Sequence, residues 1–119
     1  GHPLACAAGL ATLEVFREQK LFERTAELAP YWEEALHSLR DARHVIDIRN
    51  LGLIGGVELE PRPGKPTQRA LETFRACFEK GVLIRVTGDI IALSPPLVIN
   101  KAQIDRIVET IRDVLQQLE

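Results

Sequence analysis

The stretch GVLIRVTGDIIALSPP, residues 81–96, predicts a β-hairpin that carries a single arginine. Two apolar runs rich in β-branched residues, at 82–86 and 90–93, are separated by the turn-forming sequence Thr87-Gly88-Asp89. Arg85 lies inside the first run. A guanidinium keeps its positive charge in proteins, and its planar fork matches a carboxylate or a phosphate. Arg85 is therefore a candidate anion-binding residue.

Two alternatives for Arg85 need no ligand. Its guanidinium can pair with Asp89 across the turn, or its long side chain can reach solvent, because single charged residues are common near strand ends. The spacing of residues alone does not separate these alternatives from anion binding.

A second antiparallel pair of strands is predicted upstream of this hairpin. Residues 45–49 and 53–60 are the strands, and Asn50-Leu51-Gly52 forms the turn between them. Gly55 and Gly56 lie inside the second strand, where adjacent glycines indicate either a bulge or a close approach by another group.

Four segments have helical periodicity, approximately residues 4–16, 21–39, 70–80 and 101–118. Pro30 predicts a kink or a break in the second segment, and Asn100 with Gln103 predicts a capping box before the fourth. Helices packed on one face of a small antiparallel sheet make an α+β fold.

The first helix has two different faces. One carries the bulky residues Leu10, Leu13 and Phe16, and the other is a stripe of small residues three and four positions apart. We expect this helix either to pack on two neighbours, one of them outside this chain, or to be fully buried in the same domain. The chain also contains no methionine, which indicates a piece of a longer polypeptide.

Composition narrows the function classes. A chain of 119 residues fits one domain, and its 15 basic and 17 acidic residues form no long run of one sign. Nucleic acid and anionic membranes are therefore excluded as expected partners. Neither a bilayer-spanning segment nor a leader is visible, so we expect a cytoplasmic protein.

The sequence offers no metal site and no catalytic residue. Cys6 and Cys77 are far apart in helical apolar patterns, so both are expected to be reduced thiols in the core. The three histidines are scattered, without the spacing that a metal site or an oriented base needs. They are His2, His37 and His44.

Three separated motifs, in this order, resemble the carboxy-terminal part of class III pyridoxal-phosphate aminotransferases. They are GHPLACAA at residues 1–8, VIDIRNLGLIGG at 45–56, and residues 81–96. Within that class the chain is most similar to β-alanine (ω-amino acid):pyruvate aminotransferases, and the resemblance covers essentially the whole chain. It implies a fold type I enzyme, a homodimer or a tetramer of dimers, whose large domain holds pyridoxal 5'-phosphate.

The same resemblance implies roles for the segments and residues of this chain. Residues 1–119 would be the small domain, with residues 1–19 as a helix that bridges to the large domain. Arg85 would bind the carboxylate of the substrate and swing away when the substrate side chain is uncharged. The substrates would be small amino acids and keto acids, with an amino group passing between a β-alanine-like donor and pyruvate.

The resemblance also identifies what is missing. The cofactor needs a lysine that forms a Schiff base with it, and the four lysines here resemble none from the family's cofactor site. They are Lys20, Lys65, Lys80 and Lys101. The family's phosphate-binding Ser or Thr would lie upstream of Gly1. We therefore expect this chain alone to bind no pyridoxal phosphate and to be inactive.

Two other functions remain open from the sequence. The chain can be a free-standing α+β module for ligand binding or oligomerisation, because fold alone does not settle function. It can also belong to a class III enzyme that acts on γ-aminobutyrate, ornithine derivatives or an aminomutase substrate.

Overall fold

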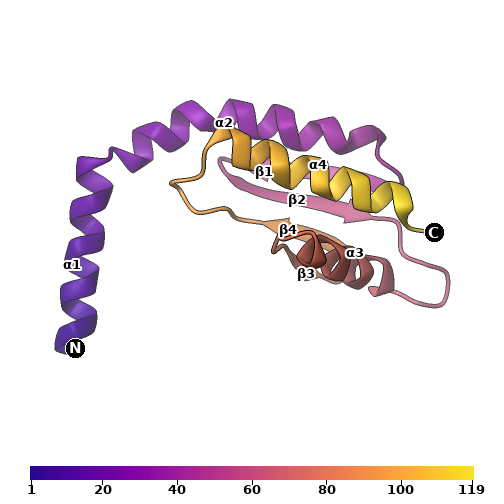
Figure 1. Ribbon diagram of the computed structural model, residues 1–119, viewed down its shortest axis with the longest axis horizontal. Helices are drawn as coiled ribbons and strands as arrows, with labels where there is room; N and C mark the ends of the chain where they lie inside the picture. Colours follow the sequence, from indigo (N-terminus) through magenta and orange to yellow (C-terminus); the bar gives the residue numbers. More distant parts are fainter.

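Two hairpins build the sheet of this protein, whose computed structural model describes all 119 residues (Figure 1). Strands β1 (Val45–Leu51) and β2 (Ile54–Leu59) form the first hairpin, and β3 (Arg85–Thr87) and β4 (Ile90–Leu93) form the second. The strand order is β1-β2-β4-β3, with every neighbour antiparallel. The second hairpin thus joins the first through β4, which leaves β3 at an edge.

Strand β3 is shorter than the sequence pattern predicts. Pairing begins at Arg85, opposite Ala92, although the apolar run begins at Val82. Continuing the pairing would bring Val82 opposite Pro95, which has no N–H to donate to a neighbouring strand. The ladder therefore ends near Leu93, and the buried side chains of Val82 and Ile84 hold the preceding segment in place instead of strand pairing, while Leu83 between them is exposed.

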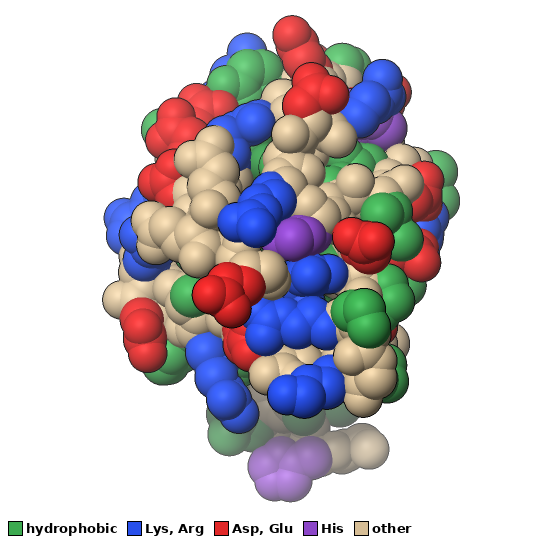
Figure 2. Space-filling view, turned by 90° about the vertical axis from the view of Figure 1, so that its right-hand side faces the viewer, with side chains coloured by type: hydrophobic (Ala, Val, Ile, Leu, Met, Phe, Trp, Pro, Cys, Tyr) green, Lys and Arg blue, Asp and Glu red, His purple; other side chains and the backbone are tan.

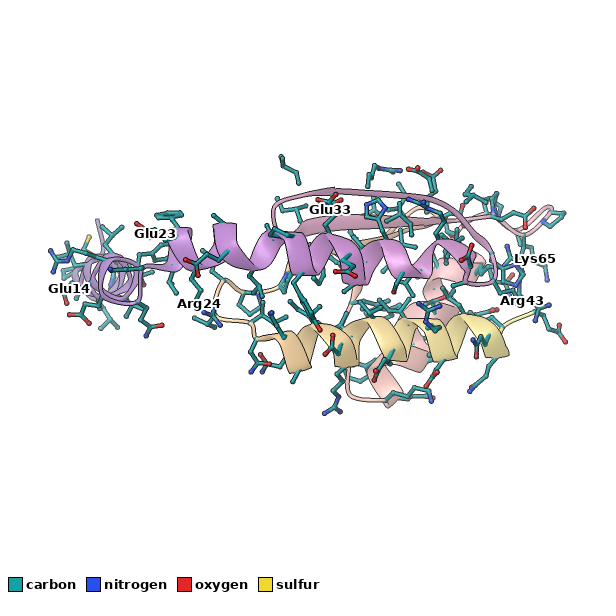
Figure 3. All side chains as sticks on the ribbon, turned by 90° about the horizontal axis from the view of Figure 1, so that it is seen from above. Glu14, Glu23, Arg24, Glu33, Arg43 and Lys65 are labelled. Carbon is teal, nitrogen blue, oxygen red and sulfur yellow. The ribbon has the colours of Figure 1, made fainter.

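Helices cover only one face of the sheet, which confirms the predicted α+β architecture. They are α2 (Leu21–His37), which a short 3-10 turn (Ser38–Asp41) extends, α3 (Gln68–Glu79) and α4 (Lys101–Gln117). Figures 1 and 3 place α4 between α2 and α3. The opposite face of the sheet carries no helix.

Helix α2 runs without interruption through Pro30, so the predicted break is absent. Pro30 cannot donate to the carbonyl of Ala26, but both residues are exposed, and water can bond that carbonyl. On the other side of the helix, Trp32 and Leu36 are completely buried. Burial of this apolar face holds the helix together across the proline.

The core lies between the helices and the sheet. Cys77 is part of it, as predicted, and burial raises the pKa of its thiol to about 11. Cys6, by contrast, is exposed on the first helix, so its predicted place in the core is wrong. Residues that are completely or almost completely buried include Trp32, Leu36, Leu39, Val57, Leu59, Ile91, Ile104, Ile111 and Leu115.

Helix α1 (Pro3–Glu18) projects away from this core (Figure 1). None of its residues is buried, and both its bulky and its small face are uncovered, with Leu10 65% and Leu13 66% exposed. The alternative of a helix buried within this domain is therefore wrong. Its aromatic contact with α2 joins Phe16 to Phe22, whose ring centroids are 5.1 Å apart. No helix is both long and apolar enough to cross a bilayer.

The capping box at the start of α4 is confirmed. The Asn100 side chain accepts from the Gln103 backbone N–H at 2.9 Å, and the Gln103 side chain accepts from the Asn100 N–H at 3.0 Å. We expect Asn100→Ala to lower the free energy of unfolding by about 1 kcal/mol, because the backbone N–H of Gln103 loses the side-chain acceptor that caps it. Urea unfolding measures this change, and Gln116→Ala, at an exposed position near the other end of α4, should leave stability unchanged.

Candidate functional site

Arg85 stands on the helix-free face of the sheet, at the edge strand. The register places it in one row with Ala92, Gly56 and Arg49, one residue from each strand. Its side chain is exposed and makes no hydrogen bond and no ion pair within the chain. The five N–H donors of this guanidinium are therefore free to bind an anion.

The predicted alternative of an ion pair between Arg85 and Asp89 is wrong. The Asp89 carboxylate instead accepts a hydrogen bond from the backbone N–H of Thr67 at 2.9 Å. Thr67 has a left-handed backbone (φ 68°) directly before α3, where the backbone N–H groups of the helix lack partners inside the helix. The Asp89 carboxylate thus accepts a hydrogen bond at the start of α3 and does not pair with Arg85, whose charge stays unpaired.

A groove of about 740 Å³ opens beside Arg85. Apolar side chains form most of its wall, and Arg85 and Arg106 are the charged residues that line it. No acidic residue lines it. Such a groove suits a ligand with an anionic group and an apolar body. Its lining comes from residues 81–85 and 92–96, with Trp32, Ile99, Gln103, Arg106 and Ile107.

The other arginine in the same row is already neutralised. Arg49 pairs with Glu58 at 2.9 Å and with Asp47, and these hydrogen bonds raise the pKa of its guanidinium. Two carboxylates compensate the charge of this guanidinium and accept N–H hydrogen bonds from it, so it would bind a further anion only weakly. On this face of the sheet, the free cation is therefore Arg85.

Two arginines at the C-terminal end of the molecule, Arg62 and Arg69, also have partners within the chain. Figure 2 looks onto that end, where Lys and Arg side chains lie among Asp and Glu. Arg62 pairs with Glu72 at 2.9 Å, and the buried Arg69 donates to the backbone carbonyl of Glu60. These arginines hold the loop between β2 and α3 in place. This structural role explains their presence without a bound ligand.

The residues of this chain do not fit pyridoxal phosphate. The cofactor requires a lysine beside an acidic group, and the groove is lined by neither. All four lysines are exposed and none of them lines the groove, with the Nζ of Lys101 4.6 Å above the Tyr31 ring. No step of the cofactor's chemistry is assigned to residues of this chain.

Several residues that line the groove could not be identified as site residues from the sequence. Arg106 and Gln103 are regular polar positions of an amphipathic helix, and Trp32 is an ordinary core residue by its spacing. No motif links these positions to Arg85, because they come from separate elements. The one available signal is Ser94-Pro95-Pro96, which marks a segment that belongs to neither a strand nor a helix.

Comparisons with known proteins agree on one family. The family model for class-III aminotransferases matches residues 1–115. An omega-aminotransferase from Caulobacter vibrioides is 69% identical over 118 residues, which is 99% of this chain. A beta-alanine–pyruvate aminotransferase from Pseudomonas aeruginosa is 40% identical over 114 residues, or 96% of the chain.

The fold of this chain also matches solved structures of transaminases. A thermostable omega transaminase mutant from Pseudomonas jessenii matches 97% of this chain with a TM-score of 0.88 at 29% identity, and the match covers 27% of that structure. The chain spans 27% of the Caulobacter protein and 25% of the Pseudomonas aeruginosa protein. It thus corresponds to about a quarter of these relatives.

Proposed function

Since this chain belongs to the class-III aminotransferase family, we propose that it is the carboxy-terminal small domain of an enzyme that transfers an amino group between an ω-amino acid, such as β-alanine, and pyruvate. The observation that carries this proposal is the free guanidinium of Arg85 at the apolar groove. Among the relatives, the one named for β-alanine and pyruvate supports the choice of substrates. Pyridoxal phosphate would be held by the part of the polypeptide outside this chain.

Arg85 is proposed to bind the carboxylate of the amino acid or keto acid. Two parallel N–H···O bonds from the guanidinium fix both the position and the plane of a carboxylate. Fixing one end of a short substrate aims its amino or keto end in a single direction, and this orientation lowers the entropic part of the barrier. The apolar side chains of the groove would contact the body of a substrate held at Arg85.

The position of Arg85 also suits a mobile role. It lies on a three-residue edge strand, and no acceptor within the chain holds its side chain. A substrate without a second charge needs no cation, and the guanidinium can then turn toward solvent without breaking an internal bond. We propose that one site accepts both kinds of substrate in this way.

Helix α1 is proposed to bridge to the large domain. Its two uncovered faces, one bulky and one small, are built for contact with further parts of the polypeptide, because small side chains let another backbone approach closely. The left-handed residue Lys20 (φ 47°) separates it from α2 and turns the chain at that point.

Amino transfer by the full-length protein tests the proposed reaction. Alanine formed from β-alanine and pyruvate is measured beside the same assay with γ-aminobutyrate or an ornithine derivative as donor. We expect β-alanine to have the highest kcat/KM. A higher value for another donor would reassign the substrate, and no transfer from any donor would favour a non-catalytic module.

A further inference from the structure

Arg24, in the first turn of α2, holds the segment between β4 and α4. Its Nη1 donates to the carbonyl of Leu97 at 2.6 Å, and its Nη2 donates to the carbonyl of Ile99 at 2.7 Å. Figure 3 shows Arg24 at the end of α2 where this segment passes toward α4. Arg24 has no acidic partner, so both of its bonds serve the backbone of that segment.

The segment at 94–99 depends on these bonds because it has few of its own. Pro95 and Pro96 have no N–H to donate, and the segment's internal backbone bond runs from the Ile99 N–H to the Pro96 carbonyl at 2.9 Å. It belongs to neither a strand nor a helix. A bidentate donor on α2 therefore supplies the order that secondary structure does not provide.

The same segment is a wall of the groove beside Arg85. Ser94, Pro95, Pro96 and Ile99 all line the groove. The segment also continues strand β4 directly, two residues after Ala92, which pairs with Arg85. A shift of the segment therefore changes both the width of the groove and the strand that supports Arg85.

We propose that Arg24 is a positioning residue for the carboxylate site: by holding the Leu97 and Ile99 carbonyls, it fixes the groove wall beside Arg85. This inference rests on the proposed function of Arg85. A planar fork with two separate nitrogens is needed to reach two carbonyls two residues apart. A lysine, which is a point charge on a flexible stem, cannot hold both in a fixed geometry.

The test compares Arg24→Gln and Arg24→Lys with wild type in the full-length holoenzyme. Each is assayed with β-alanine and with an amine that has no carboxylate. We expect KM for β-alanine to rise about tenfold in Arg24→Gln and less in Arg24→Lys, because a displacement of about 1 Å is costly for an oriented substrate. KM for the amine and kcat should change less than about twofold. The matched control is the exposed neighbour Glu23→Gln, which should resemble wild type.

Hydrogen exchange of the same variants adds a readout that does not depend on activity. Amides of residues 97–99 should exchange faster in Arg24→Gln than in wild type, while those of the core strand β2 should not. Unchanged exchange would overturn the proposed hold on the segment. Equal loss of activity on both substrates would indicate a general structural role and overturn the positioning role, as would failure of both variants to fold.

The Arg85→Ala variant, assayed in parallel, separates this proposal from the proposed function. If Arg85→Ala affects the two substrates differently and the Arg24 variants do not, only the role of Arg24 is wrong. If Arg85→Ala does not distinguish the substrates, the carboxylate site itself is wrong, and the role of Arg24 falls with it.

Discussion

Replacing Arg85 by alanine in the full-length enzyme is expected to raise KM for β-alanine about 100-fold, because hydrogen bonds to charged groups contribute about 1.5–3 kcal/mol and each 1.4 kcal/mol is a factor of ten. The structure supports a value near the upper end, since no internal acceptor competes for this guanidinium and the groove beside it is largely apolar. Steady-state kinetics with β-alanine and with an amine that lacks a carboxylate measure the effect. KM for the amine should change by less than about twofold.

Two control variants sharpen this result. Arg85→Lys keeps the charge but loses the fork, so KM for β-alanine should take an intermediate value. Arg75→Ala removes an exposed arginine of α3 that makes no hydrogen bond, and its kinetics should match wild type. Equal increases in KM for both substrates in Arg85→Ala would contradict the carboxylate role.

Replacing Gly55 by alanine is expected to destabilise the protein by about 2 kcal/mol, in the usual range for overpacking a filled core. A Cβ at Gly55 would lie 2.5 Å from Cδ2 of Leu36 and 3.3 Å from Cζ2 of Trp32. Both side chains are completely buried, so neither can move aside without disturbing the packing of α2 on the sheet. Urea unfolding measures the change as a lower midpoint with an unchanged slope.

The adjacent Gly56 provides the matched control. It points to the helix-free face, where a Cβ would find its nearest neighbour, Cγ of Arg49, at an ordinary 3.6 Å. Gly56→Ala should therefore be neutral or slightly stabilising, because alanine loses less backbone entropy on folding than glycine. A similar loss of stability in both variants would show that strand conformation, and not the contact with Trp32 and Leu36, requires the glycines.

The Gly55-Gly56 pair illustrates how far sequence reasoning reaches. Two glycines in a strand predict either a bulge or a close approach, and the structure shows a close approach at Gly55. The register irregularity lies instead in β1, between Val45 and Asp47. Only the packing of α2 against β2 decides between the two, because the pressing side chains come from residues about twenty positions upstream.

Local signals otherwise predicted local structure well. The hairpins and the capping box at Asn100 depend on neighbours within a few residues, so the sequence itself carries them. Where predictions failed, the presence or absence of contacts from distant parts of the sequence was decisive. Cys6 is exposed because nothing in this chain covers α1, and Asp89 is drawn away from Arg85 by the N–H of Thr67.

The sequence by itself determined the α+β class, the element order and Arg85 as the candidate anion-binding residue, because periodicity, turn residues and a permanent charge are properties of short segments. Only the tertiary structure decided the strand order, the groove and the free state of Arg85. The physical reason is that a groove is lined by side chains from separate elements, and whether a charge is paired depends on which acceptors folding brings within reach. Arg24 and the carbonyls of Leu97 and Ile99, more than 70 residues apart in the chain, meet for the same reason.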